Sequence, residues 1–353
     1  MYEEDRAPVT LTEIYHQADA CQRTIERAEE RSRIFDKFLP LENYTDIIIT
    51  GCGSSHHLAM CASFAWSEML QRPVIAAASS ELAHFPEYYL PGNSRPLVIA
   101  ISRSGGTTEV KLAVERLNRD YCARAVAVTS DCGDVGSVCE AEIVFSECLE
   151  QSVVMTQAFT CMLVGLYLLA DGATGSSRSA EITQLPNLIY RALQSSEKVI
   201  RRIVEDRNIN RFFFLGSGAM KGLADECALK MTEMSLDTAF SFRTLEFRHG
   251  PKATLNPSDQ VIIFPAEEEE QYLDALLAEI AATGARVLVI EEGTRRVQSL
   301  RRSVLHIDGH LPESLRPALY AHVGQESAYW RAAARDLNPD APRHLARTVV
   351  LDV

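Results

Sequence analysis

The sequence predicts an α/β protein made of two doubly wound parallel sheets, and three observations support this. Short apolar runs alternate with helical segments along the chain, which is typical of parallel sheets covered by helices. A strand, a glycine-rich turn and a helix follow one another at residues 46–70. The same pattern returns at residues 211–220, where Gly216 stands 165 residues after Gly51. This repetition indicates a tandem duplication.

Composition excludes several classes of protein. The 353 residues suggest about two domains of ~150 residues each. The net charge of −13 comes without a basic stripe, so we expect no nucleic-acid partner. No apolar run reaches the ~18 residues of a membrane span, and the first residues do not resemble a signal peptide. Nine cysteines without C-x-x-C spacing predict reduced thiols, a cytoplasmic protein and no zinc site.

The first half begins with a predicted N-terminal helical segment, residues 1–42, in which apolar residues recur at helical spacing. A first domain is predicted at residues 43–180. Its strands are expected at 46–50, 74–78, 97–101, 125–129 and 141–145, and its helices at 57–70, 109–117 and 157–170.

The second half is predicted to form a second domain at residues 181–353. The polar, glycine- and serine-rich stretch 171–178 is expected to be the linker before it. Strands are expected at 211–215, 260–264 and 287–290, and helices at 185–204, 223–236 and 271–283.

The loop SRSGGTT, residues 102–108, follows the third expected strand. Hydroxyls, two glycines and a helix N-terminus together favour binding of an anion such as phosphate. An ordinary capped turn is the alternative interpretation, because Ser and Thr are common caps. Nearby hydroxyls of Ser54 and Ser55 strengthen the prediction of a ligand site at this sheet edge. The matching loop of the second half, FPAEEEEQ, carries four carboxylates that would repel phosphate.

A helix at residues 223–236 carries Glu226, Lys230 and Glu233 on one face. This spacing is typical of a solvated ladder of charges. The rest of the helix is apolar, however, which indicates that the helix is buried. Buried charged residues need partners or a functional role. His249 follows in a turn before Gly250, and a carboxylate with a histidine can shuttle protons.

Six motifs in order resemble those of the tandem sugar isomerase (SIS) domain family. They are GCGSS, SRSGGTTE, VVMTQAFT, LGSG with ECALKMTE, EFRHGPK and DAPRHLARTVVL. The chain is similar to the isomerase half of glucosamine-6-phosphate synthase and to AgaS-type amino-sugar-phosphate isomerase/deaminases. The resemblance implies two SIS domains, each a three-layer αβα sandwich. We expect no glutaminase activity, because no glutaminase domain precedes Met1 and Met1-Tyr2 offers no N-terminal Cys nucleophile.

The resemblance also implies roles for individual residues. Glu233 matches the enolising base, and His249 matches the ring-opening acid/base that reaches in from another subunit. Lys230 is a catalytic candidate on the same helix. The expected substrate-binding residues are Ser55, Ser102, Arg103, Ser104, Thr107, Val153, Glu226, Ala346 and Arg347.

One departure from the synthase pattern concerns Arg347, which stands where the synthase has an imine-forming lysine. A guanidinium stays protonated and cannot form that imine.

The expected activity is therefore acid–base isomerisation, with or without deamination, of a hexose or hexosamine 6-phosphate, without metal or other cofactor. A fructosamine-6-phosphate deglycase and a non-catalytic sugar-phosphate-binding regulator remain as alternatives. A homodimer or homotetramer with shared sites is expected, with no membrane partner.

Overall fold

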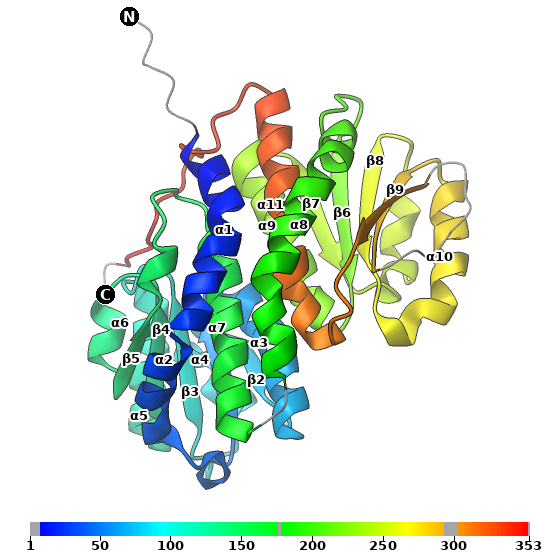
Figure 1. The fold of residues 1–353 in the computed structure, drawn as a ribbon. Helices are drawn as coiled ribbons and strands as arrows, with labels where there is room; N and C mark the ends of the chain where they lie inside the picture. Colours follow the sequence, from blue (N-terminus) through cyan, green and yellow to red (C-terminus); the bar gives the residue numbers. More distant parts are fainter. Residues whose placement is uncertain (1–7, 176–177, 293–301, 352–353) are drawn as a thin grey trace, which may run out of the picture. The chain divides into compact units, whose positions relative to one another are not determined.

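The computed structural model describes residues 8–175, 178–292 and 302–351, and Figure 1 traces their helices and strands. The described chain divides into two compact units, each with its own sheet. One unit holds the first sheet and consists of residues 17–150, 157–186 and 346–353. The other holds the second sheet and consists of residues 1–16, 151–156 and 187–345. The helices α1 (Val9–Glu26) and α8 (Ser179–Val204) run across this division.

The first sheet has five parallel strands in the order β2-β1-β3-β4-β5. Helices α4, α5 and α6 pack on one face, over a core formed by residues such as Val98 and Leu117. Helices α2, α3 and α7 form the opposite layer, where Trp66 of α3 donates to the Leu166 carbonyl of α7 at 3.0 Å. The bounds are β1 Ile47–Gly51, β2 Ile75–Ala78, β3 Leu97–Ser102, β4 Arg124–Thr129, β5 Ala141–Val144, α2 Ala28–Phe35, α3 Ser54–Leu70, α4 Ser79–His84, α5 Thr108–Tyr121, α6 Asp134–Ser137 and α7 Gln157–Thr174.

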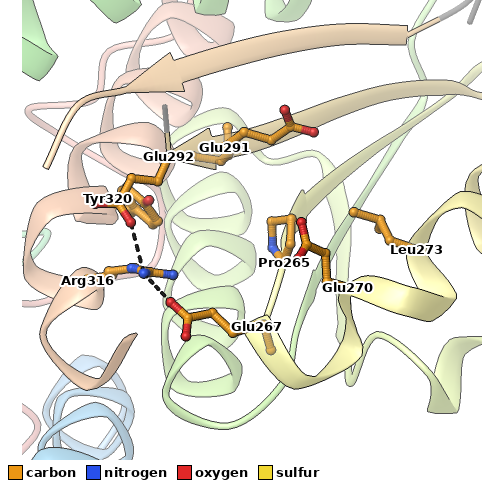
Figure 2. A pocket seen from close by; sticks show the side chains of 10 residues that line it. Pro265, Glu267, Glu270, Leu273, Glu291, Glu292, Arg316 and Tyr320 are labelled. Atoms are coloured by element: carbon orange, nitrogen blue, oxygen red, sulfur yellow. Dashed lines mark hydrogen bonds and ion pairs between the residues drawn. The ribbon is translucent and has the colours of Figure 1, made fainter. Parts of the chain in front are cut away.

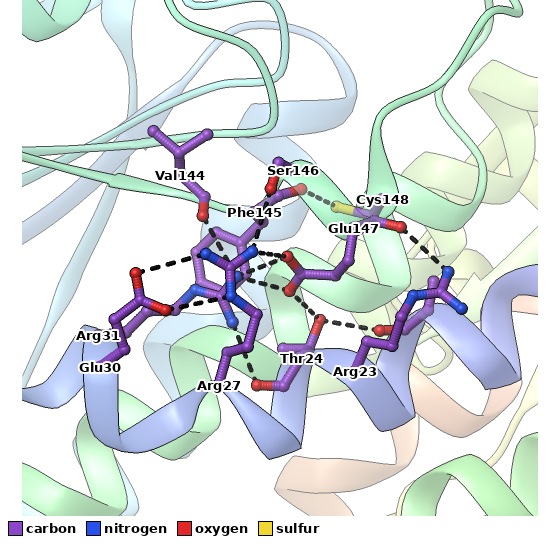
Figure 3. Close-up of polar contacts among 11 residues, drawn as sticks. Arg23, Thr24, Arg27, Glu30, Arg31, Val144, Phe145, Ser146, Glu147 and Cys148 are labelled. Atoms are coloured by element: carbon purple, nitrogen blue, oxygen red, sulfur yellow. Dashed lines mark hydrogen bonds and ion pairs between the residues drawn. The ribbon is translucent and has the colours of Figure 1, made fainter.

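A buried ion pair fixes the N-terminal helices to this sheet. Arg31 of α2 pairs with Glu147 at 2.6 Å, and both side chains are almost fully buried. The same guanidinium donates to the Thr24 carbonyl at 3.1 Å and lies 4.1 Å from the centre of the Phe145 ring, as Figure 3 shows. Because a buried charge is costly without partners, these contacts lock α2 beside the end of β5.

The second sheet also has five parallel strands, in the order β10-β9-β8-β6-β7. Helix α10 covers one face, with Leu276 and Ile280 in the core, and α9 packs on β6 and β7. Helix α11 packs on α9. The bounds are β6 Arg211–Gly216, β7 Thr238–Phe242, β8 Asp259–Phe264, β9 Arg286–Glu292, β10 Arg302–Ile307, α9 Ala219–Ser235, α10 Glu270–Ala282 and α11 Arg316–Ala334.

Both sheets have the same topology. Counted along the chain, the first and second strands of each sheet lie at one edge, and the fourth and fifth strands lie at the other. The expected parallel α/β sheets are thus confirmed. The turns after β1 and β6 also match. Gly53 has φ 53° and ψ −125°, and Gly218 has φ 56° and ψ −132°. Only glycine adopts this conformation readily, which explains the Gly-x-Gly spacing in both halves.

The structure corrects the expected linker at residues 171–178. Helix α7 continues to Thr174, and Asp171 is buried. The Asp171 carboxylate accepts the Arg178 main-chain N–H at 2.9 Å and a bond from the Ser179 hydroxyl. The aspartate therefore joins the end of α7 to the start of α8, and residues 176–177 of the expected linker lie outside the described part. Within that part, every helix is too short or too polar to cross a membrane.

Candidate active site

The three charged residues predicted to share one face of α9 lie together in the structure. The Lys230 Nζ is 3.4 Å from Glu226 Oε1 and also forms an ion pair with Glu233. The Lys230 side chain is only 1% exposed and that of Glu226 is nearly as buried, whereas Glu233 is 19% exposed. The predicted burial is therefore confirmed for Lys230 and Glu226, and the alternative of a solvated ladder of charges does not hold for these residues. A buried ammonium instead holds a carboxylate that reaches the surface.

Burial of α9 follows from its close contact with α11. A Cβ placed on Gly324 of α11 would lie 2.4 Å from the Cys227 sulfur, so only glycine fits there. At the end of β6, a Cβ on Gly216 would lie 2.4 Å from the carbonyl oxygen of Met220 in the first turn of α9. These two glycines let the helix pack tightly on both a neighbouring helix and its own strand, which leaves Lys230 without solvent.

His249 is exposed and follows the short 3-10 helix η5, Glu246–Arg248. Its main-chain N–H donates to the Glu246 carbonyl at 3.0 Å. Within the described residues, its imidazole makes no hydrogen bond or ion pair. Phe247 anchors this turn, since its buried ring lies 5.8 Å from Phe213 and 5.5 Å from Phe242. The histidine is therefore presented to solvent from a rigid base.

Val153 belongs to the same compact unit as α9, in the segment 151–156. Glu13 of α1 accepts the Gln151 main-chain N–H at 2.6 Å and also accepts the Ser152 hydroxyl. Gln325 of α11 donates to the Thr156 carbonyl at 3.0 Å. Both ends of the segment are thus fixed, which holds the Val153 main chain in place.

In the unit of the first sheet, the loop after β3 has a defined shape. Ser102 Oγ and Thr107 Oγ1 lie 2.9 Å apart, and Ser104 Oγ accepts the Gly106 N–H at 3.3 Å. A Cβ on Gly105 would lie 2.6 Å from the Asp131 carbonyl oxygen, so the loop depends on glycine at this position. The hydroxyls therefore gather at the N-terminus of α5, as the sequence predicted for an anion site.

Ser55 lies at the corresponding end of β1, in the first turn of α3, and is buried. Its main-chain N–H donates to the Cys52 carbonyl at 3.0 Å. Because β1 and β3 are neighbours in the sheet, their carboxyl ends meet at one edge. Ser55 and the loop 102–107 thus emerge from the same edge, where a ligand would be expected.

Arg103 is buried, and its guanidinium is already engaged. Nη1 pairs with Glu150 at 3.2 Å, and Nη2 donates to the Arg347 carbonyl at 3.0 Å. Glu150 is itself buried and accepts the Ala158 N–H at 3.1 Å, in the first turn of α7. These contacts give Arg103 a second role beside the predicted phosphate contact, which is to hold the C-terminal tail.

The C-terminal tail lies along the loop after β3. The Leu351 N–H donates to Thr108 Oγ1 at 3.1 Å, and a Cβ on Gly106 would lie 3.4 Å from the Thr348 methyl group. Ala346 is exposed, and the Arg347 guanidinium is 3.7 Å from Asp131. The two tail residues named from sequence are therefore grouped with the predicted phosphate loop.

The sequence did not single out Glu150 or Glu13, which anchor these segments. Each stands among both polar and apolar neighbours in the sequence, and such acidic residues are common on surfaces. Among the described residues, no group of three or more His, Cys, Asp or Glu side chains is arranged to hold a metal ion.

Comparisons with known proteins define the class to which this fold and these residues belong. The SIS-domain family model matches residues 207–331, which include Glu226, Lys230, Glu233 and His249. The structure of glucosamine-6-phosphate deaminase from Thermotoga maritima is 30% identical, covers 97% of this chain and 99% of its own, and gives a TM-score of 0.78. The chain therefore belongs to the SIS-domain family.

Two further relatives extend this finding. Glutamine–fructose-6-phosphate aminotransferase (isomerizing) from Chlamydia abortus is 28% identical over 361 residues, which is 97% of this chain and 58% of that protein. The chain thus spans little more than half of this curated relative. Tagatose-6-phosphate ketose/aldose isomerase from Escherichia coli is 23% identical, with a TM-score of 0.84 and 95% and 97% of the two chains covered, and shares the fold.

Proposed function

We propose that this protein isomerises, with or without deamination, a hexose or hexosamine 6-phosphate by proton transfer between C1 and C2. The observation that carries the proposal is the Glu226–Lys230–Glu233 cluster of α9. Lys230 is buried and paired with both carboxylates, and only Glu233 reaches the surface. A fixed carboxylate that reaches the surface suits a general base that removes a carbon-bound proton.

In this mechanism, His249 assists ring opening by moving a proton between the ring oxygen and the C1 hydroxyl. Glu233 then takes a proton from C2 of the open aldose or C1 of the ketose and returns it to the neighbouring carbon. The intermediate is an enediol, or an enolamine where an amino group is present. Lys230 keeps the Glu233 carboxylate oriented. In the deaminase outcome, the proton returns to C1 of the enolamine and leaves an imine at C2. Water then adds to C2, the C2–N bond breaks, and ammonia leaves as the C2 ketone forms.

The substrate class is supported by two comparisons. The Thermotoga relative is a deaminase of glucosamine 6-phosphate, and the curated relatives act on fructose 6-phosphate. The hydroxyl-lined loop 102–107 favours a phosphate in the unit of the first sheet. Ser55, Ser102, Ser104 and Thr107 are the proposed phosphate ligands, with main-chain contacts to the sugar from Val153 and Ala346.

We also propose that the chain is a tandem pair of SIS domains, with domains at residues 43–180 and 181–353. The shared strand order and the matched Gly53 and Gly218 turns support a duplication. The active form is proposed to be a homodimer or homotetramer in which His249 serves the partner's site. Its exposed imidazole is consistent with that role.

The test is NMR of the protein with glucose, fructose, tagatose, glucosamine and galactosamine 6-phosphates in D2O. Turnover should place deuterium at C1 or C2, and ammonia release would identify deamination. The Glu233→Gln variant should lose about 10²-fold or more in kcat. Asp225→Asn changes a different ion-paired carboxylate of α9 and should retain activity.

The same assay separates the alternatives. Release of an amine from fructosamine 6-phosphate, without isomerisation of the other sugars, would identify a deglycase. Tight binding of a sugar phosphate with no deuterium exchange in any of them would identify a regulator and refute catalysis.

A further inference from the structure

Helix α10 connects two separate features of the unit that holds the second sheet. Its first turns border the pocket shown in Figure 2, where Glu270 and Leu273 line the wall. Glu279 lies in the last turn of the same helix and does not line that pocket. The Glu279 carboxylate instead contacts the chain on both sides of His249.

Glu279 pairs with two cations that flank His249 in the sequence. The Arg248 guanidinium donates from Nε to Glu279 Oε2 at 3.1 Å and from Nη2 to Oε1 at 2.5 Å. The Lys252 ammonium donates to Oε2 at 2.5 Å. Both carboxylate oxygens are thus engaged. The two parallel bonds from Arg248 fix the direction of its guanidinium as well as its distance.

The turn between these two cations has little packing of its own. Gly250 has φ 125°, which favours glycine, and a Cβ placed on it would meet no atom of the described chain within 4 Å, its sequence neighbours aside. Glycine is therefore needed here for the backbone conformation and not for space. Phe247 and Leu255 are buried, but the segment 248–254 between them has no buried residue. Core contacts therefore do not hold the turn directly.

The carboxylate itself stands on a fixed support. Phe247 and Leu255 belong to the same core cluster as Leu276 and Ile280 of α10. Glu279 precedes Ile280 in the sequence, so its main chain is anchored by that packing. Arg248 and Lys252 are thus held by a residue of the packed helix and not by a second mobile segment.

The charges of this cluster are more important for geometry than for folding. The side chains of Arg248, Lys252 and Glu279 are each 30–33% exposed, and ion pairs with this exposure add little to stability. Hydrogen bonds from Arg248 and Lys252 lower the pKa of Glu279 to about 2, so its carboxylate is charged at neutral pH. A small displacement of a catalytic group can nevertheless cost a large factor in rate.

We propose that Glu279 is a positioning residue for His249 in the ring-opening step. By holding Arg248 and Lys252, it fixes the direction in which the turn presents the imidazole. The inference rests on the proposed function, in which His249 moves a proton between the anomeric hydroxyl and the ring oxygen. Glu279 acts through the turn and contacts no reacting atom.

The test compares sugars that form rings with analogues that cannot. Fructose 6-phosphate and tagatose 6-phosphate close through O5, whereas their 5-deoxy analogues stay open because O6 carries the phosphate. Deuterium exchange at C1 in D2O reports enolisation of each compound. Glu279→Gln should lower kcat for the ring-forming sugar by about tenfold or more, leave KM nearly unchanged, and keep kcat for the open analogue within about twofold of wild type.

Two further variants define the comparison. His249→Ala removes the imidazole itself and should show the same preference for the open analogue. In that background Glu279→Gln should cause no further loss, because Glu279 acts only through His249. Asp274→Asn removes an exposed carboxylate of α10 that makes no ion pair within the described residues, and it should match the wild type.

Hydrogen exchange of the peptide 246–254 gives a readout that needs no substrate. Exchange should rise by about tenfold in Glu279→Gln and not in Asp274→Asn, while thermal unfolding verifies that both variants are folded. Unchanged exchange in Glu279→Gln would overturn the inference. A preference for the open analogue in His249→Ala that is absent from Glu279→Gln would refute this inference alone. No preference in His249→Ala would refute the proposed role of His249, and the inference with it.

Discussion

The Arg103 guanidinium lies 3.0 Å from the main-chain carbonyl of Arg347, although 244 residues separate the two in sequence. The same guanidinium pairs with the buried Glu150, which accepts an N–H of α7. One side chain therefore joins the loop after β3, the start of α7 and the C-terminal tail. The tail is held by a buried charge and is not merely adjacent to the loop.

This relationship predicts the effect of Arg103→Gln. The shorter, neutral amide cannot reach both Glu150 and the tail, so tail amides near Leu351 should exchange hydrogen faster by about tenfold or more. Hydrogen exchange of the C-terminal peptide measures this. Arg119→Gln, an exposed arginine on α5, is the matched control and should exchange as the wild type does. Unchanged exchange in Arg103→Gln would contradict the proposed anchoring role.

A second prediction concerns the loop after β3. Replacing Ser104 and Thr107 together by Ala removes two hydroxyls at the N-terminus of α5 and should raise the Kd for the sugar phosphate by about tenfold or more. Titration with the phosphorylated substrate and with its unphosphorylated sugar measures the change. The double variant should bind both sugars with similar weakness. A Kd that does not move would place the phosphate elsewhere.

Much of the fold was predictable from sequence, because buried parallel strands appear as continuous apolar runs and glycine-rich turns follow some of them. The strands β7 and β10 and the helix α11 were not predicted. β7 is partly exposed and lies at the sheet edge, so its pattern is weak. α11 is buried nearly all round, and its buried Glu326 and Arg331 interrupt the apolar pattern. The secondary structure of such segments is decided by tertiary contacts, which a short stretch of sequence does not contain.

The site was predictable only in part for the same reason. The spacing of Glu226, Lys230 and Glu233 placed them on one face, which the structure bears out as a contact cluster. The spacing alone could not say that Lys230 is buried. The apolar residues on the rest of the helix did indicate burial, and the close approach of α11 accounts for it. Likewise, no residue near Arg103 in the sequence predicts its contact with the C-terminal tail.

The exposed His249 leads to a third prediction, on the assembly. If His249 serves the active site of a partner subunit, neither Glu233→Gln nor His249→Ala homodimers should turn over substrate. Mixed subunits should regain activity, because hybrid dimers contain one site with both residues intact. The rate after subunit exchange, with native mass spectrometry to verify hybrids, measures this. Verified hybrids without activity would refute shared sites.

The fourth prediction is that no covalent imine forms during turnover. Arg347 cannot act as the nucleophile because its guanidinium stays protonated, and Lys230 is buried with its ammonium paired to two carboxylates. Borohydride reduction during turnover should therefore leave no sugar adduct on any peptide. Mass spectrometry of the digest measures this, with a known imine-forming aldolase as the positive control. A reduced adduct on Lys230 would overturn the acid–base mechanism.

The last prediction concerns stability and rests on Glu326, a fully buried residue of α11. Its carboxyl group accepts the Ser196 hydroxyl at 2.7 Å and the Tyr15 hydroxyl at 3.3 Å. Burial raises the pKa of Glu326 to about 8, and the nearby charge of Glu197 adds to this, while the two hydroxyls oppose it. An unfolded glutamate has the ordinary value of 4.5. Between these two values the folded state binds more protons than the unfolded state.

The sign of the effect follows from that difference. The free energy of unfolding should fall as the pH rises from 4.5 to about 8, by up to ~1.4 kcal/mol per pH unit from this group alone. His322 of the same helix acts in the opposite direction below pH 6.5, because burial lowers its pKa to about 4. The window from pH 6.5 to 8 therefore isolates Glu326.

Thermal unfolding of wild type and Glu326→Gln across that window measures the effect. The variant should gain stability relative to the wild type as the pH rises, whereas Glu197→Gln, which alters the partly exposed neighbour, should largely keep the wild-type slope. Parallel curves for wild type and Glu326→Gln would show that Glu326 does not titrate in this range.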